Sequence, residues 1–122
     1  GSDGFTRSPR DKTHPRAFAT FPHAIRYFVA EKRVVTLEEC VRKATGLTAS
    51  ALGFQHKGVI ADGMDADLVV FDFDRLDACA DFDNPTRTCD GILHVLVGGK
   101  VAYENGRLTG THAGRFIKRG EA

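Results

Sequence analysis

Residues 63–72 read Gly-Met-Asp-Ala-Asp-Leu-Val-Val-Phe-Asp, and this stretch decides the fold of the second half of the chain. Its apolar run, residues 68–71, is unbroken and rich in strand-forming side chains, which is typical of a strand covered on both faces. The preceding residues, 61–66, predict a turn. Residues 58–60, Gly-Val-Ile, predict a further short strand just upstream.

Downstream, the sequence predicts a β-hairpin. Two strand-like runs, 92–97 and 100–103, are separated by Gly98-Gly99, which suits a two-residue turn. Asn105-Gly106 marks another turn. Between the first strand and the hairpin lies a polar excursion over residues 74–87, in which residues 76–78 predict one helical turn.

Upstream, residues 1–19 read as a loop because they show no apolar periodicity. A first helix is expected to begin near Thr20, which can act as the N-cap, with Pro22 tolerated in the first turn. Its apolar stripe is formed by Ile25, Phe28 and Val29.

The second helix has clearer end signals. Thr36 and Glu39 have the spacing of a capping box, and Gly46 stands where a left-handed C-cap is expected. A third, short helix is predicted over residues 48–52, with Thr48 as its cap and Gly53 after its end. Helices therefore come first and strands second, which predicts an α+β fold with an N-terminal loop, two to three helices and then a small β-domain with a hairpin.

The bulk composition is that of one globular domain. Of 122 residues, 42% are hydrophobic and 27% charged, and the formal net charge of +1 gives no electrostatic case for nucleic acid or a membrane surface. No apolar run reaches the roughly 18 residues of a membrane helix. The three cysteines lack Cys-x-x-Cys spacing, so we expect a reducing, cytoplasmic compartment.

Two short sequence motifs near the N-terminus contain candidate catalytic or binding residues. Asp3, in Ser2-Asp3-Gly4, could ligate a metal and transfer a proton, but the same residue pattern is typical of a simple turn. In His14-Pro15-Arg16, the arginine could bind a carboxylate or be solvated. His14 could be a ligand or a hydrogen-bonded surface residue. From the residues alone, these alternatives stay open.

The sequence contains no local set of metal ligands. A structural or catalytic zinc site needs three or four converging ligands. The remaining histidines form neither His-x-His nor His-Glu-x-x-His; they are His23, His56, His94 and His112. Nine aspartates fall between Ala61 and Asp90, but they lack the order of an EF-hand loop and indicate a solvated acidic face. We therefore expect no metal to bind tightly to this chain alone.

In their order along the chain, several phrases resemble the D-aminoacylase (N-acyl-D-amino-acid deacylase) branch of the amidohydrolase superfamily. They are Ser2-Asp3-Gly4, His14-Pro15-Arg16, Thr20-Phe21-Pro22, Thr45-Gly46-Leu47-Thr48-Ala49 and residues 63–72. The Ala-Asp-Leu-Val-Val-Phe-Asp phrase is general to amidohydrolases with a small β-domain, whereas His-Pro-Arg and Phe-Pro narrow the resemblance to this branch. The stretch between Asp3 and His14 is slightly longer than in the family pattern.

The resemblance implies a parent with a metal-bearing TIM-type barrel and a small β-domain built from both chain ends. Residues 1–57 would be the C-terminal end of the barrel, and residues 58–122 the C-terminal part of the β-domain. The parent would use zinc-activated water to hydrolyse the amide of N-acyl-D-amino acids. Asp3 would be catalytic and would ligate the metal with ligands missing from this chain. Arg16 and His14 would bind the substrate, and Arg16 would do so by contacting the carboxylate of the substrate.

Consequences follow for the chain by itself. We expect it to be inactive as a fragment and to have neither nucleic acid nor membrane as partner. It should either adopt a rearranged, self-sufficient small fold or self-associate through exposed strand edges. Two alternatives are another amidohydrolase of the cyclic-amide hydrolase type and a non-catalytic assembly module.

Overall fold

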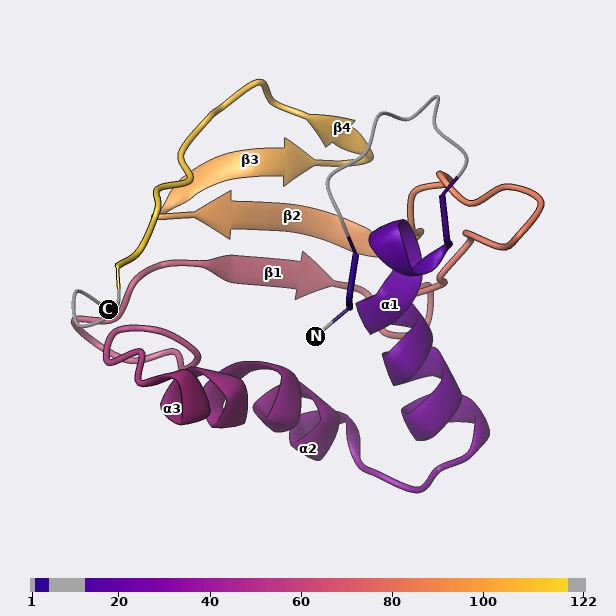
Figure 1. Cartoon of the computed structure of the whole chain (residues 1–122), viewed down its shortest axis with the longest axis horizontal. Coiled ribbons are helices and arrows are strands. Elements are labelled where there is room, and N and C mark those ends of the chain that lie inside the picture. Colours follow the sequence, from indigo (N-terminus) through magenta and orange to yellow (C-terminus); the bar gives the residue numbers. More distant parts are fainter. Residues whose placement is uncertain (1, 5–12, 119–122) are drawn as a thin grey trace. The chain divides into compact units, whose positions relative to one another are not determined.

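The computed structural model describes residues 2–4 and 13–118, and Figure 1 shows its order of elements. The helices precede a four-stranded antiparallel sheet, so the predicted α+β class is confirmed. The chain divides into two compact units. Unit 1 is Gly1–Val34 with Phe71–Ile92, and unit 2 is Val35–Val70 with Leu93–Ala122.

The first helix, in unit 1, begins earlier than predicted. Helix α1 spans Arg16–Ala24 and continues as a π-helical segment, Ile25–Glu31. Pro15, whose ring fixes a helix-compatible φ, occupies the N-cap position, and so Thr20 lies inside the helix instead of capping it. The Thr20 hydroxyl donates to the Arg16 carbonyl at 2.8 Å. The predicted loop over residues 1–19 therefore ends at Pro15, and its residues 5–12 lie outside the described part.

Pro22 inside α1 has a structural consequence. Proline has no N–H, so the carbonyl four residues earlier, that of Phe18, loses its usual helical donor. The Cys89 thiol donates to this carbonyl at an Sγ–O distance of 3.2 Å. Burial raises the pKa of Cys89 to about 11, which keeps the thiol protonated and able to donate. A side chain 71 positions away thus replaces the missing backbone bond.

The acidic segment of unit 1 contains no helical turn at residues 76–78, so that prediction is wrong. Asp72 Oδ1 accepts hydrogen bonds from the backbone N–H groups of Asp74 and Arg75, which gives these amides a partner outside any helix. Asp77 then pairs with Asp90 in an isolated antiparallel bridge. Leu76 is 1% exposed and is the most buried side chain of the described residues.

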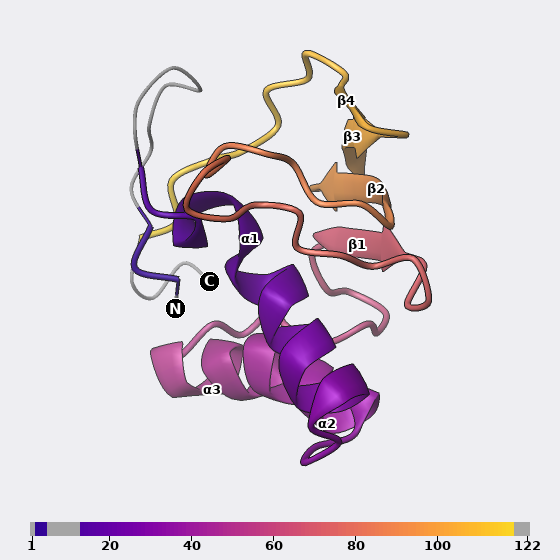
Figure 2. The same cartoon turned by 90° about the vertical axis from the view of Figure 1, so that its right-hand side faces the viewer.

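The helices of unit 2 form one continuous run of α2 (Leu37–Arg42), a π-helical segment (Lys43–Leu47) and α3 (Thr48–Leu52), shown in Figure 2. The Thr36 cap is confirmed, because its hydroxyl accepts from the Glu39 N–H at 3.2 Å. The Glu39 carboxylate binds Arg42 at 2.6 and 2.9 Å instead of completing a capping box.

Two end signals in this run were misread. Gly46 does not end a helix; a Cβ there would lie 3.2 Å from the Gly58 carbonyl oxygen, so glycine permits a close approach of two segments. Thr48 does not cap α3, since its hydroxyl donates to the Lys43 carbonyl at 2.8 Å. The end of α3 is as predicted, with Gly53 in the left-handed conformation (φ 77°).

The sheet has the strand order β1-β2-β3-β4 (Figure 1). The strands are β1 (Leu68–Phe71), β2 (Ile92–Val97), β3 (Lys100–Glu104) and β4 (Arg107–Leu108). Strands β2 and β3 form the predicted hairpin across Gly98-Gly99, with Val97 paired to Lys100. The Asn105-Gly106 turn is also present and leads into β4, which the sequence did not predict. Residues 58–60 form no strand.

Strand β1 departs from its predicted environment. Its unbroken apolar sequence predicts cover on both faces, yet Val69 is 55% and Val70 44% exposed. Across the described residues, the buried apolar side chains are Ala19, Ala49, Leu76 and Ala78, whereas 14 large apolar side chains are exposed. The described part therefore leaves much apolar surface uncovered. No helix within it combines the length and apolar character required to cross a membrane.

Candidate functional site in unit 1

The Ser2-Asp3-Gly4 turn is positioned by its backbone. Asp3 has a φ of 53°, in the left-handed region that Asp tolerates better than most residues. The Gly4 N–H donates to Ser2 Oγ at 3.2 Å. A Cβ on Gly4 would lie 3.1 Å from the Cα of Ala17, so a residue without a side chain lets the turn rest on the first turn of α1.

This contact places Asp3 beside the first residue of α1. Arg16 Nη1 donates to Asp3 Oδ2 at 2.9 Å, and the two residues are 13 positions apart. Both side chains face solvent, with 76% of Asp3 and 45% of Arg16 exposed. An exposed ion pair of this kind contributes about 0–1 kcal/mol, so it can be exchanged for another partner at small cost.

His14 belongs to the same cluster because its ring accepts a hydrogen bond from the backbone of Arg16. The Arg16 N–H donates to His14 Nδ1 at 3.1 Å. The neutral ring therefore carries its proton on Nε2, which makes that nitrogen a donor. The structure thus brings together all three residues that the sequence singled out: Asp3, His14 and Arg16.

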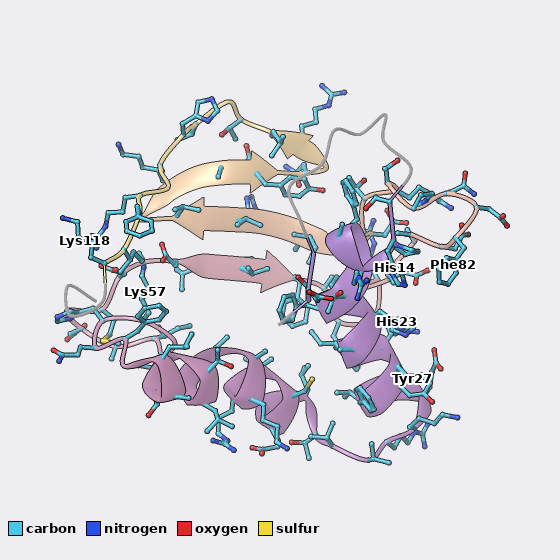
Figure 3. All side chains as sticks on the ribbon, viewed as in Figure 1. His14, His23, Tyr27, Lys57, Phe82 and Lys118 are labelled. Atoms are coloured by element: carbon cyan, nitrogen blue, oxygen red, sulfur yellow. The ribbon has the colours of Figure 1, made fainter. Side chains whose placement is uncertain are left out.

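A fourth residue of this cluster was not predicted. The ring of Phe82 meets the His14 ring edge-on, with centroids 5.0 Å apart and an interplanar angle of 77° (Figure 3). Phe82 lies in the acidic segment, 68 positions away in sequence, and no local pattern indicates such a contact. The one available signal is an aromatic residue between Asp81 and Asp83, where a solvated face predicts none.

The described residues contain no group of three or more His, Cys, Asp or Glu side chains that could hold a metal ion. Two of the remaining histidines have other neighbours. His23 stacks on Tyr27 with ring centroids 5.9 Å apart, and His94 Nδ1 lies 3.5 Å from a Glu104 carboxylate oxygen. Within the described residues, Asp3 therefore lacks the two or more neighbouring ligands with which it could hold a metal ion.

Two aspartates of the 63–72 stretch, Asp65 and Asp67, share a partner within unit 2. Lys57 Nζ binds the Asp65 carboxylate at 2.8 Å and also the Asp67 carboxylate. Asp67 Oδ1 in turn accepts from the Gly98 N–H of the hairpin turn at 2.7 Å. The hydrogen bond from Lys57 holds the pKa of both carboxyls below the usual range, and the same bonds raise the pKa of Lys57. Asp67 therefore links residues 63–67 to the hairpin turn, while Asp65 shares its lysine partner.

Comparison with known proteins places these observations in a family context. The family model described as "Amidohydrolase family" matches residues 1–103. D-aminoacylase from Alcaligenes xylosoxydans xylosoxydans is 39% identical over 119 residues, which is 98% of this chain and 24% of the relative. The chain thus spans about a quarter of the length of the relatives that it matches.

Two solved structures are also similar. A D-aminoacylase structure concerned with the role of its binuclear metal center superposes with a TM-score of 0.90 at 40% identity, covering 98% of this chain and 25% of that one. N-acyl-D-glutamate deacylase from Bordetella bronchiseptica, complexed with zinc and a phosphonate mimic of the tetrahedral intermediate, gives a TM-score of 0.79 at 39% identity, covering 88% and 22%.

Proposed function

The chain belongs to the amidohydrolase family, and from this we propose that it is the C-terminal region of a zinc-dependent hydrolase that cleaves the amide bond of N-acyl-D-amino acids. The observation that carries the proposal is the Asp3–Arg16 contact of 2.9 Å. It joins a carboxylate suited to proton transfer with a guanidinium suited to a substrate carboxylate. Similarity to deacylases over nearly the whole chain supports the substrate class.

We assign residues 1–57 to the end of the barrel and residues 58–122 to the small β-domain. The exposed apolar side chains of the helices and of β1 support this assignment, because barrel-side helices and a two-sided strand need further layers to cover them. In the absence of that cover, the isolated chain is expected to self-associate through the edge of β1.

Asp3 fits a metal only as one ligand among several. Its carboxylate is exposed and has the oxygen that zinc accepts, and the other ligands must come from outside the described residues. A bound zinc ion supplies a water of lowered pKa and polarises the amide carbonyl. Asp3 Oδ2 takes up the proton released by the attacking water and delivers it to the leaving amide nitrogen.

Arg16 and His14 bind the substrate. For the α-carboxylate to reach Arg16, the guanidinium must exchange Asp3 for the substrate, and the exposure of the pair makes this exchange inexpensive. The exchange also frees Asp3 for proton transfer. His14 Nε2, a donor when Nδ1 accepts from the Arg16 N–H, is suited to a substrate oxygen.

The test uses the protein encoded by the complete reading frame, loaded with zinc, and N-acetyl-D- and L-amino acids. Asp3→Asn should lower kcat at least 100-fold, as expected for loss of a general acid–base. Asp62→Asn, which alters an exposed carboxylate in a turn of unit 2, is the matched control and should leave kcat unchanged. Equal activity of Asp3→Asn and the wild type would contradict the proposal, as would turnover by the isolated 122-residue chain.

A further inference from the structure

Phe82 lies against the candidate site in a way that packing does not explain. Large aromatic side chains gain most by burial, yet Phe82 is 79% exposed. Within residues 2–4 and 13–118, the one aromatic ring that it contacts is that of His14, edge-on (Figure 3). His14 Nδ1 in turn accepts from the Arg16 N–H. Phe82 is therefore two contacts away from the residue assigned to the substrate carboxylate.

The loop that carries Phe82 is braced by its own side chains. Asp81 Oδ1 accepts from the N–H groups of Asp83 at 2.9 Å and Asn84 at 2.6 Å, and the Asp81 N–H donates to the Asn84 carbonyl at 3.4 Å. Such Asx-type bonds fix the path of the backbone on both sides of the residue between them. The braced turn therefore holds Phe82 outward, beside His14.

We propose that Phe82 is a specificity-determining residue that provides an apolar surface for the side chain of the D-amino acid, so that the enzyme prefers large apolar side chains to acidic ones. The proposal rests on the function given above, in which Arg16 binds the α-carboxylate. The amino-acid side chain and the α-carboxylate are attached to the same carbon atom. In the proposed binding mode, a carboxylate bound at the Arg16 guanidinium directs the side chain toward the Phe82 ring, which contacts the His14 ring.

Charge around Phe82 favours the same choice. Asp81 and Asp83 flank it in the chain, and Arg16 is already occupied by the α-carboxylate of the substrate. A second carboxylate placed beside Phe82, as in N-acyl-D-glutamate, would be repelled by these aspartates, because charges at physiological ionic strength interact over about 8 Å. Family membership alone does not settle this preference, because similar proteins include both a D-aminoacylase and deacylases of acidic substrates.

The experiment compares the zinc-loaded, full-length enzyme with its Phe82→Ala and Phe82→Leu variants on the N-acetyl derivatives of D-leucine, D-alanine and D-glutamate. For the wild type, kcat/KM should be at least about tenfold higher for D-leucine than for D-glutamate. Phe82→Ala should raise KM for D-leucine about tenfold with kcat unchanged and alter KM for D-alanine less than about twofold. Phe82→Leu should restore most of the loss. Phe116→Ala is the matched control, because Phe116 is also a highly exposed phenylalanine, and it should change neither constant.

Each other outcome overturns the proposal in a distinguishable way. An unchanged KM in Phe82→Ala, or a wild-type preference for D-glutamate, overturns the specificity role and leaves the proposed function intact. An equal rise of KM for D-leucine and D-alanine assigns Phe82 a structural role. Absence of wild-type activity on every N-acetyl-D-amino acid, or activity that persists in Asp3→Asn, overturns the proposed function and this inference with it.

Discussion

Replacing Gly91 with alanine tests the tightest backbone approach in unit 1. Gly91 is buried and has a φ of 80°, and a Cβ there would lie 2.6 Å from both the N and Cα atoms of Leu76 and 2.7 Å from the carbonyl carbon of Arg75. These are backbone atoms, which cannot rotate away as a side chain can. Relief of the clash must therefore displace Leu76, the most buried side chain described.

The expected loss has two parts. A left-handed conformation costs a residue with a Cβ about 1–2 kcal/mol, and overpacking a fitted site costs about 1–3 kcal/mol more. Gly91→Ala should therefore destabilise the local structure by about 3 kcal/mol. Gly63→Ala is the matched control: its φ is 81°, but no atom lies within 4 Å of the added Cβ, so only the conformational part applies.

Native-state hydrogen exchange measures both effects where they arise. The Asp72 amide donates to the Gly91 carbonyl at 2.8 Å, and the Asp65 amide, beside Gly63, donates to the His56 carbonyl at 2.8 Å. Gly91→Ala should speed exchange of the Asp72 amide more than about 100-fold, whereas Gly63→Ala should speed that of Asp65 about five- to thirtyfold. Similar accelerations in the two variants would refute the steric argument, because the conformational part alone would then account for both.

Three further predictions concern other contacts. Lys57 lowers the pKa of the Asp65 and Asp67 carboxyls, so the stability that these carboxylates add to the fold should be complete above about pH 4 and be lost as pH falls through their lowered pKa values. The pKa of Lys57 is raised, so the stability that its ammonium adds should be complete below about pH 10.5 and be lost as pH rises through the raised pKa. In Lys57→Met, the unfolding temperature measured across pH should fall less steeply at both the acid and the alkaline ends. An unchanged pH dependence would disprove the contribution of the Lys57 ion pairs. The Cys89 thiol, with its pKa raised from 9.0 to about 11, should form about 100-fold less thiolate than an ordinary thiol and alkylate correspondingly slowly at pH 8; a normal rate would contradict its burial. Thr36→Ala should destabilise α2 by about 1 kcal/mol in chemical denaturation while Thr36→Ser should not, and equal losses would exclude the cap.

Signals that act within a few residues were the ones the sequence could predict. The Thr36 cap, the Gly98-Gly99 turn and strand β1 depend on neighbours in the chain, and all three are present. The start of α1 was predicted too late because Thr20 has a side chain suited to an N-cap. The helix begins instead after Pro15, whose ring fixes a helical φ. Gly46 was misread because glycine is needed there for the close approach to Gly58, which lies 12 positions away in the sequence.

Contacts between distant segments could not be predicted. The sequence singled out Asp3 and Arg16 separately, but nothing in their spacing indicates that the side chains meet at 2.9 Å. The Cys89 thiol on the Phe18 carbonyl and the Phe82 ring on His14 likewise join segments with no local relation. These contacts depend on how the acidic segment folds against α1 within unit 1, which is determined by packing.

The energies at Asp3 indicate what holds its carboxylate in place. The left-handed backbone of Asp3 destabilises the turn by about 1 kcal/mol, and the exposed ion pair with Arg16 stabilises it by no more than about the same amount. The pair therefore cannot be what fixes the turn. The Gly4 N–H donates to Ser2 Oγ inside the turn, and among the described residues the contact that links the turn to α1 is the close approach of Gly4 to Ala17, which is made by backbone and is independent of charge. Because this contact survives when Arg16 turns to another carboxylate, a substrate can take the guanidinium while Asp3 keeps its place, as the proposed reaction requires.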